Sequence, residues 1–230
     1  MNAFWTKSLC GLAIVMLATP SSFAMLAVDF NKTNTAANTQ AGFVGVGVGG
    51  ATVTGSSVGS SVNVSLATNP GGAIDDRDRD ADNGTTSPSP TNLSKDFVFG
   101  VRGQGSNYLD VILSGVDAGT YTFTGYFHDS FPANDSVRDA TMDVDFREGI
   151  NSFTDAFTTA RTDDSMSPIG EGSFTFTSTG GDLTFRIASD KNGHLINGFT
   201  LAAVPEAGAF LVWSVLSGVA VVRHRRKRSA

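Results

Sequence analysis

The chain has 230 residues, of which 40% are hydrophobic, and a formal net charge of −6. The acidic balance disfavours nucleic acid as a partner, because no basic stripe is present to replace the counterions around phosphates. The single cysteine, Cys10, excludes an intramolecular disulfide.

Residues 1–24 have the pattern of a secretory signal peptide. Lys7 supplies the positive start, residues 9–18 form an apolar segment too short to span a bilayer, and Ala24 ends a cleavage site with small residues. Cleavage after Ala24 would remove Cys10 and leave a mature chain without a thiolate for catalysis or zinc binding. The sequence therefore predicts an exported protein.

Residues 25–203 are predicted to form one all-β domain, a β-sandwich. Short segments with alternating apolar and polar residues are separated by turn signals rich in Gly, Asn and Asp. We expect strands at 27–30, 41–48, 51–64, 95–102, 108–113, 120–127, 140–146, 172–178, 182–188 and 195–201. The same period of two predicts that three apolar residues face one way: Phe97, Phe99 and Val101. Many short strands at this spacing are typical of a sandwich or a jelly roll.

Acidic residues dominate this domain. Residues 25–204 hold 21 Asp and Glu against 10 Lys and Arg, a net charge of −11. Such a surface is compatible with calcium and with neutral glycans as ligands.

Residues 69–92 are predicted to form a long acidic loop, because they contain almost no apolar surface to bury. Four alternating aspartates are arranged like the first half of a calcium-binding loop: Asp76, Asp78, Asp80 and Asp82. The glycine and the closing acid of such a loop are out of place, and Arg77 and Arg79 would neutralise the carboxylates. The alternative to a calcium site is a solvated, self-paired run of charges. Any metal bound by these oxygen ligands would be a hard cation such as calcium.

Polar and aromatic residues that suit sugar binding gather at expected strand ends. Aromatic rings stack on the apolar faces of sugars, and the polar groups hydrogen-bond hydroxyls. The candidates are Tyr126, His128, Asp129, Asn192 and His194, with Arg102, Asn107 and Tyr108 as further members. The alternative is that these residues belong to turns and to the core. Core positions are the expectation for Tyr121, Phe123, Phe127, Phe174, Phe176, Phe185 and Phe199.

No constellation typical of catalysis is present. The domain has two histidines and neither a Gly-x-Ser-x-Gly nor a His-Glu-x-x-His motif. His128 and Asp129 are adjacent, so on a strand they would point to opposite faces. Asp143 and Asp145 would share a face, but such pairs arise by chance among so many aspartates. The sequence therefore predicts a protein that is not an enzyme.

The domain as a whole resembles the galactose-binding-like jelly rolls, which include the malectin-like domains. The resemblance lies in the opening strand 28–30, in 113–121 leading into 126–129, and in the closing strand 194–199. It implies a jelly-roll β-sandwich with its ligand on loops at one end or on a concave sheet face. It also implies that a structural calcium is common.

The C-terminal residues contain three signals in succession. Val204, Pro205 and Glu206 precede the uncharged apolar segment 208–222. A basic cluster follows, formed by Arg223, Arg225, Arg226, Lys227 and Arg228. A helix over residues 207–222 would be about 24 Å long, short of the roughly 30 Å hydrocarbon core. It would cross the membrane with the basic side chains snorkelling on the cytoplasmic side.

This tail resembles the PEP-CTERM sorting signal of bacterial envelope proteins, although Ala207 stands where that motif has a second proline. The resemblance implies that an exosortase cleaves the tail and that the protein reaches the cell envelope or the extracellular matrix. A plain C-terminal membrane anchor is the alternative.

The sequence thus predicts an exported, non-catalytic surface or matrix protein that binds polysaccharide. Two alternatives are a secreted carbohydrate-active enzyme on a jelly-roll scaffold and a structural adhesin without a small ligand.

Overall fold

The computed structural model describes residues 25–32, 38–56, 58–79, 91–129, 140–162, 169–191 and 193–205. The predicted signal peptide and the tail from Glu206 onward, with its predicted membrane helix, lie outside these residues. Within the described part of the chain, no helix has the length and hydropathy needed to cross a bilayer.

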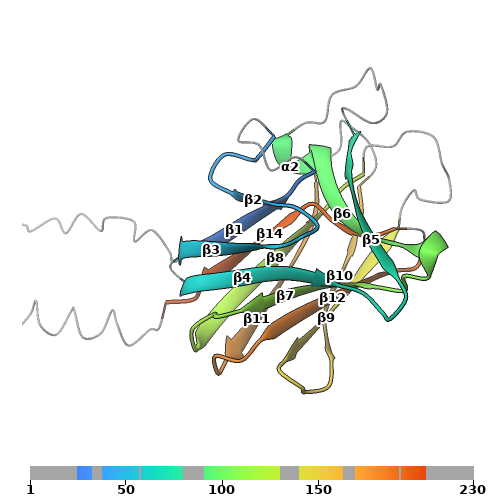
Figure 1. Cartoon of the computed structure of the whole chain (residues 1–230). Helices are drawn as coiled ribbons and strands as arrows, with labels where there is room; N and C mark the ends of the chain where they lie inside the picture. The colour runs from blue at the N-terminus through green and yellow to red at the C-terminus, as the bar shows by residue number, and fades with distance from the viewer. Residues whose placement is uncertain are drawn as a thin grey trace, which may run out of the picture.

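The fold is an all-β sandwich with a small third sheet at one end (Figure 1). The first sheet has the order β11 (Gly170–Ser178), β8 (Gly119–Phe127), β14 (Gly198–Ala203), β1 (Met25–Phe30) and β2 (Val44–Val46). The second has the order β10 (Thr154–Ala160), β9 (Thr141–Glu148), β12 (Leu183–Ser189), β7 (Leu109–Ser114), β4 (Gly59–Ala67) and β3 (Ala51–Ser56). Neighbouring strands run antiparallel except β1 and β2, which are parallel.

The third sheet has the order β13 (His194–Ile196), β6 (Asp96–Val101) and β5 (Ala73–Asp78). The short helix α2 (Asn92–Lys95) leads into β6, and the 3-10 turn η1 (Arg102–Gln104) follows it. Figure 1 shows this sheet crossing the end of the sandwich that lies opposite the N-terminal end of β1.

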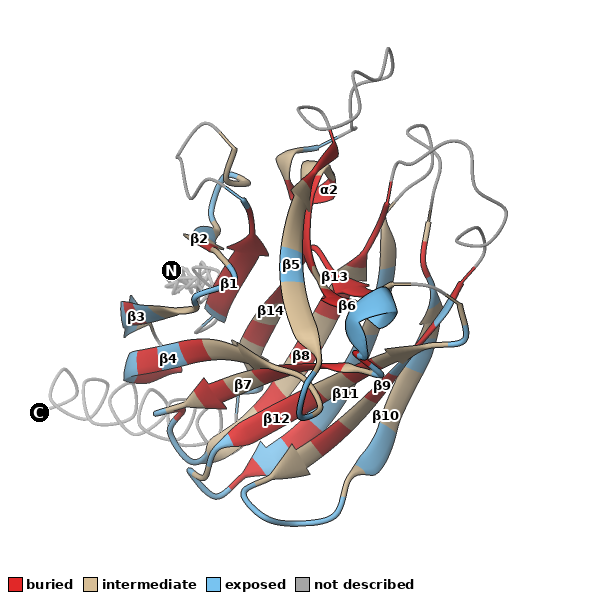
Figure 2. Cartoon of the chain, turned by 45° about the vertical axis from the view of Figure 1, so that its right-hand side comes forward, coloured by how far each residue is buried: buried red, intermediate tan, exposed pale blue. Residues whose placement is uncertain are grey.

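Aromatic side chains from the two large sheets meet in the core. The ring of Phe123 on β8 stacks on that of Phe185 on β12, with 3.9 Å between centroids, and lies 5.4 Å from Phe199. Along β8 the buried residues alternate with half-buried threonines (Figure 2). Six of the seven aromatics predicted for the core are buried, and Phe174 is half-buried and packs against them, so that prediction is confirmed.

The loop predicted for residues 69–92 is wrong over Ala73–Asp78, which form β5. The strand pairs with β6 along its full length, with Arg77 opposite Phe97. The charged side chains are tolerated because the guanidinium groups lie over aromatic rings, where a cation is attracted to the π face. Alternation of Asp and Arg therefore gives a strand with two different faces, not a solvated loop.

Asn197 joins the third sheet to the sandwich. It lies fully buried between β13 and β14. Its Oδ1 accepts the backbone N–H of His128 at 2.5 Å, and its Nδ2 donates to the carbonyl oxygen of Asp96 at 2.9 Å. Its own backbone bonds to Tyr126 and Phe30. One side chain thus fixes where β6 starts relative to the end of β8.

Candidate ligand-binding site

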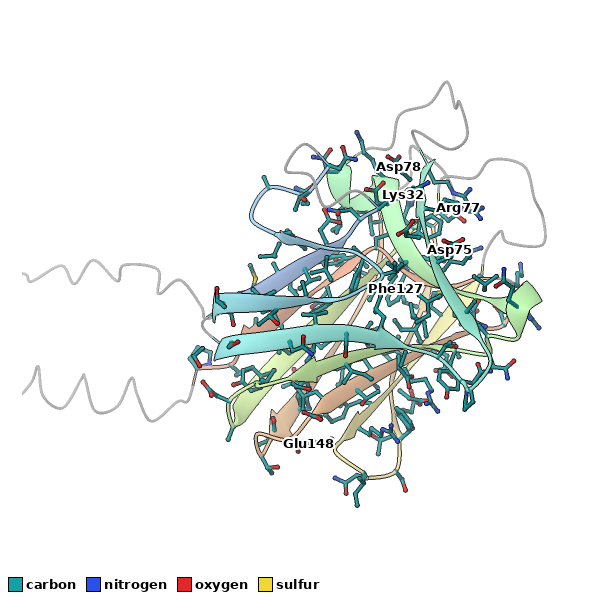
Figure 3. All side chains as sticks on the ribbon, viewed as in Figure 1. Lys32, Asp75, Arg77, Asp78, Phe127 and Glu148 are labelled. Atoms are coloured by element: carbon teal, nitrogen blue, oxygen red, sulfur yellow. The ribbon has the colours of Figure 1, made fainter. Side chains whose placement is uncertain are left out.

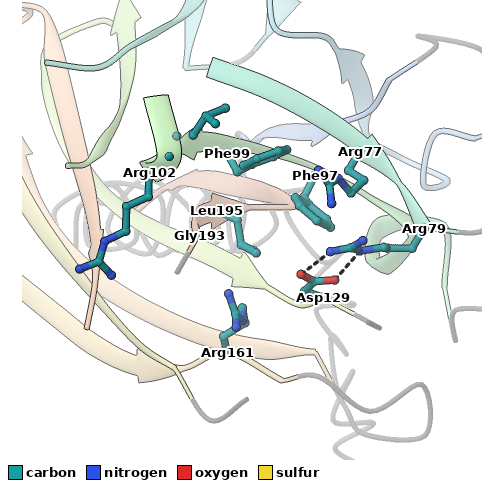
Figure 4. A pocket seen from close by; sticks show the side chains of 12 residues that line it. Arg77, Arg79, Phe97, Phe99, Arg102, Asp129, Arg161, Gly193 and Leu195 are labelled. Atoms are coloured by element: carbon teal, nitrogen blue, oxygen red, sulfur yellow. Dashed lines mark hydrogen bonds and ion pairs between the residues drawn. The ribbon is translucent and has the colours of Figure 1, made fainter. Parts of the chain in front are cut away.

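A pocket of about 360 Å³ lies between the third sheet and the strand ends of the sandwich (Figure 4). Its lining comes from β5 and the residue after it, from β6 and η1, from β13, and from the segments after β8 and β10. The lining residues are Arg77, Arg79, Phe97, Phe99, Gly100, Val101, Arg102, Gly103, Asp129, Arg161, Gly193 and Leu195.

Aromatic rings and guanidinium groups form one wall of this pocket. The period of β6 points Phe97 and Phe99 into it, while Val98 between them is fully buried in the core. Val101 also lines the pocket, so the prediction that three apolar residues of this strand face one way is confirmed. The guanidinium carbon of Arg77 lies 5.1 Å from the Phe99 ring centroid, and that of Arg79 lies 5.2 Å from Phe97.

A buried ion pair closes one side of the pocket. Arg79 donates from Nε to one carboxylate oxygen of Asp129 at 2.5 Å and from Nη2 to the other at 2.7 Å. Both side chains are buried. Two parallel charge-assisted hydrogen bonds of this kind hold a geometry as well as contributing energy. They tie the residue after β5 to the end of β8.

The pocket is basic in a domain that is acidic. Among the described residues its lining holds four arginines, Arg77, Arg79, Arg102 and Arg161, and one carboxylate, Asp129. Four of the domain's ten basic residues therefore surround one hollow. Arg102 is exposed and Arg77 half-buried, and neither forms an ion pair with the described part of the chain.

The structure distributes the predicted sugar-binding residues over several environments. Asp129 lines the pocket, and Asn192 lies outside the described residues. The ring of Tyr126 packs against Phe43 at 6.3 Å and does not line the pocket. His128 and His194 are 0% and 3% exposed and neither lines the pocket, contrary to the prediction of a sugar-binding face.

Both histidines have structural surroundings. His128 Nδ1 lies 2.7 Å from Thr162 Oγ1 and helps to join the ends of β8 and β10. Burial lowers the pKa of His194; the charge of Arg102 acts in the same direction and the Ser106 backbone opposes it. A neutral imidazole in β13 follows, which suits a buried strand.

Of the further candidates, Arg102 lines the pocket and the other two do not. The Tyr108 ring lies under Arg186, 3.6 Å from its guanidinium carbon, and the backbone N–H of Asn107 donates to Asn69 Oδ1 at 2.7 Å. Those two residues brace a turn and a neighbouring strand.

The predicted calcium loop does not form as a loop. Asp76 and Asp78 lie on β5, where they share the face opposite Arg77, and Asp80 and Asp82 lie outside the described residues. An extended strand separates alternate residues by about 7 Å, whereas a calcium loop has to wrap its ligands around one ion. The loop expected to carry the site is therefore not formed at Asp76 and Asp78, and calcium binding by these four residues stays a prediction.

Another acidic group lies on the second sheet. Asp143, Asp145 and Asp155 each bring one oxygen to within 4.8 Å of the others. Asp143 and Asp155 are exposed, and the pKa of Asp145 is raised by burial and by the charges of Asp143 and Asp155, with Arg186 opposing the shift. Exposed carboxylates of this kind are common without an ion, so we assign no cation to them.

Two carboxylates are fully buried: Asp96 at the start of β6 in the third sheet, and Asp29 on β1. Burial raises the pKa of Asp96 to about 7; Asp78 and Asp29 add to this, while the Lys32 backbone and Lys95 oppose it. Burial likewise raises the pKa of Asp29 to about 6, opposed by a 2.6 Å hydrogen bond from the Gln40 backbone. In Figure 3, Lys32 and Asp78 lie at one end of the molecule and Glu148 lies at the other.

Sequence reasoning missed the pairing that creates the pocket. Arg77 and Arg79 were assigned to a charge run, although their period of two matches that of Phe97 and Phe99 on the next strand. Alternating arginines in one segment and alternating phenylalanines in the next, separated by turn-forming residues, could have predicted two paired antiparallel strands with the arginines over the rings.

No protein-family model and no curated protein matches the chain. Among solved structures it is similar to the Clostridium thermocellum xylanase 10B CBM22-1–GH10 modules complexed with xylohexaose, at 10% identity and a TM-score of 0.40. That alignment covers 63% of this chain and 26% of that one. The CBM22-1 xylan-binding domain of Paenibacillus barcinonensis Xyn10C matches at 16% identity and a TM-score of 0.39, over 62% of this chain and 87% of that one.

The Eiger TNF of S. frugiperda matches at 10% identity and a TM-score of 0.30, over 64% of this chain and 93% of that one. A xylan-binding domain and a TNF thus align with similar shares of this chain. The ligand therefore has to be argued from the chain's own residues.

Proposed function

We propose that this chain is an exported, non-catalytic domain of the cell surface or extracellular matrix that binds a polysaccharide in the pocket between the third sheet and the sandwich. The observation that carries the proposal is the half-buried ring of Phe99 beside Arg77 in the pocket lining, next to the buried side chains of Phe97 and Arg79. Ring faces suit the apolar faces of sugars, and guanidinium groups donate to their oxygens. A volume of about 360 Å³ falls in the range of small-molecule sites, roughly 300–1,000 Å³.

The pocket chemistry favours binding over catalysis. Among the described lining residues the carboxylate is that of Asp129, which two hydrogen bonds from Arg79 hold in a fixed position. Both histidines are buried elsewhere. A general acid or base needs a group that can exchange a proton with the substrate, and Asp129 in this pairing is poorly suited to that role.

The arrangement of the strands supports a role at a surface. Met25 pairs with Ala202, and the N–H of Val204 donates to the Thr120 carbonyl at 2.8 Å, so the predicted signal-peptide cleavage site and sorting motif adjoin the same end of the sandwich. From Thr120, β8 runs toward Asp129 in the pocket, about 30 Å at 3.3 Å per residue. A chain held by its tail would then present the pocket away from the membrane.

The first test concerns the aromatic wall. We expect Phe99→Ala to weaken polysaccharide binding about tenfold, because burying the ring against a ligand contributes about 1–2 kcal/mol. Affinity electrophoresis of the full-length chain in mild detergent, across a panel of soluble polysaccharides, measures the effect. Phe153→Ala is the matched control, since that ring also lies beside an arginine, Arg147 at 4.4 Å, but is not part of the pocket.

If a polysaccharide slowed the migration of Phe99→Ala and Phe153→Ala equally, the pocket would not be the binding site. Release of sugar fragments from a bound polysaccharide, followed by chromatography, would instead favour the carbohydrate-active enzyme. Absence of binding across the panel would favour the structural adhesin.

The second test concerns the tail. We propose that an exosortase-type enzyme recognises Val204, Pro205 and Glu206 and removes the apolar segment and basic cluster. Val204 and Pro205 follow directly after β14 and are exposed, so the first two residues of the motif are accessible to an enzyme. Mass spectrometry of the mature protein from its native host should find a C-terminus near Glu206. An intact Arg-rich end would mean a plain anchor.

A further inference from the structure

We infer that the polysaccharide bound in this pocket is acidic, and that Arg77 and Arg102 bind an oxyanion on its sugar units. The inference rests on the proposed function and adds the substrate class. The oxyanion is a carboxylate or a sulfate ester, both of which accept two parallel hydrogen bonds from a guanidinium group.

The distribution of charge is the first argument. The domain carries a net charge of −11, yet the described part of the pocket lining carries four arginines against one aspartate, which pairs with Arg79. Like charges gathered around a hollow of low dielectric repel one another, and the field they focus attracts an anion. A pocket for a neutral glycan would not require this local excess in a chain with so few basic residues.

The two arginines approach the hollow from different elements. Arg77 stands on β5 beside Phe99, and Arg102 stands on η1, across the pocket in Figure 4. Neither forms an ion pair with the described part of the chain. An acidic polysaccharide lying in the pocket would therefore meet guanidinium groups from both elements.

The pair between Arg79 and Asp129 shows the chemistry that this pocket already supports. One guanidinium group there holds a carboxylate through two hydrogen bonds, shielded from water. Arg77 lies two residues earlier on the same face of β5 and presents the same group with no carboxylate of the described chain opposite it. A ligand oxyanion would complete the second pair.

The experiment compares matched acidic and neutral polysaccharides on the full-length chain in mild detergent. The probes are polygalacturonate with its carboxyl-reduced form, and dextran sulfate with dextran. We expect at least one acidic probe to bind about tenfold more tightly than its neutral partner, since a hydrogen bond to a charged group contributes about 1.5–3 kcal/mol. Added salt should weaken that preference.

The variants test which residues carry the preference. In the double variant, Arg77→Gln with Arg102→Gln, the ratio of the affinity for the acidic probe to that for its neutral partner should fall about tenfold. Arg102→Gln alone, at an exposed position, should lose part of the preference without any effect on folding. Arg147→Gln is the matched control, because this half-buried arginine also lies over a phenylalanine but outside the pocket.

The outcomes separate the inference from the proposed function. Equal binding of each acidic probe and its neutral partner, unchanged in the double variant, would overturn the inference and leave polysaccharide binding intact. Binding to none of the four probes would overturn both the inference and the proposed function. So would binding to polyglutamate, an acidic polymer without sugars, as tightly as to the acidic polysaccharides. Binding to dextran sulfate alone assigns the oxyanion as sulfate, and binding to polygalacturonate alone assigns it as carboxylate.

Discussion

Replacing Asp96 by asparagine should stabilise the protein at pH 8 by about 4 kcal/mol and leave its stability near pH 4 unchanged. The carboxyl group is fully buried, and both oxygens lack a well-formed hydrogen bond to the described part of the chain. It lies directly opposite Asp78 in the pairing of β5 with β6, where like charges repel. Asparagine keeps the shape and removes the charge.

The sign follows from the raised pKa. In the folded protein Asp96 has a pKa of about 7, whereas an unfolded aspartate titrates near 3.9. Below pH 4 the group is protonated in both states and carries no penalty. Between about pH 4 and pH 7 the unfolded state loses its proton first, so wild-type stability falls as pH rises. A difference of about 3 pKa units corresponds to about 4 kcal/mol, and Asp29, with a pKa of about 6, adds to the same slope.

Urea unfolding of wild type and Asp96→Asn at several pH values between 4 and 8 measures this difference. The variant should show a clearly flatter dependence on pH. Asp182→Asn, a change at an exposed position just before β12, is the control and should run parallel to wild type. If the variant were less stable at pH 8, and calcium raised the melting temperature of wild type alone, the buried carboxylates would be a cation site.

Periodicity explains which parts of the molecule the sequence could predict. The alternation of Tyr121 and Phe123 with threonines specifies a strand with one buried face, and the structure buries both rings. Most strands of the sandwich were predictable for that reason, but β10 was missed, because none of its residues is buried and it carries no regular apolar face. The jelly-roll topology and the sorting signal stay predictions.

The pocket depends on a pairing that no single segment reveals. The Asp-Arg run of 75–79 has no apolar face, so taken alone it predicts a solvated loop. This segment forms a strand because its arginines pack over the rings of Phe97 and Phe99 on β6. Asp129 could be predicted as a pocket residue from its place at a strand end. The burial of His128 could not be predicted, because it depends on contacts with distant parts of the chain.

We expect Asn197→Ala to lower the free energy of unfolding by about 2–5 kcal/mol. The amide satisfies two buried backbone groups, the N–H of His128 and the carbonyl of Asp96. Alanine cannot replace either hydrogen bond, and each buried polar group left without a partner costs about 1–3 kcal/mol. A domain of this size has a total stability of only about 5–15 kcal/mol, so the loss should be visible as a large drop in the urea midpoint.

The same substitution should also weaken ligand binding, because the two backbone groups carry the pocket. Asp96 begins the strand that holds Phe97 and Phe99, and His128 precedes Asp129. Without the amide, β6 and the end of β8 lose a direct link, and the wall can shift relative to the ion pair. Asn63→Ala, at an exposed position on β4, is the control and should change stability by less than about 0.5 kcal/mol. An Asn197→Ala protein as stable as this control would mean that water or the strand pairing satisfies both groups, and that the third sheet is held by its β5–β6 hairpin alone.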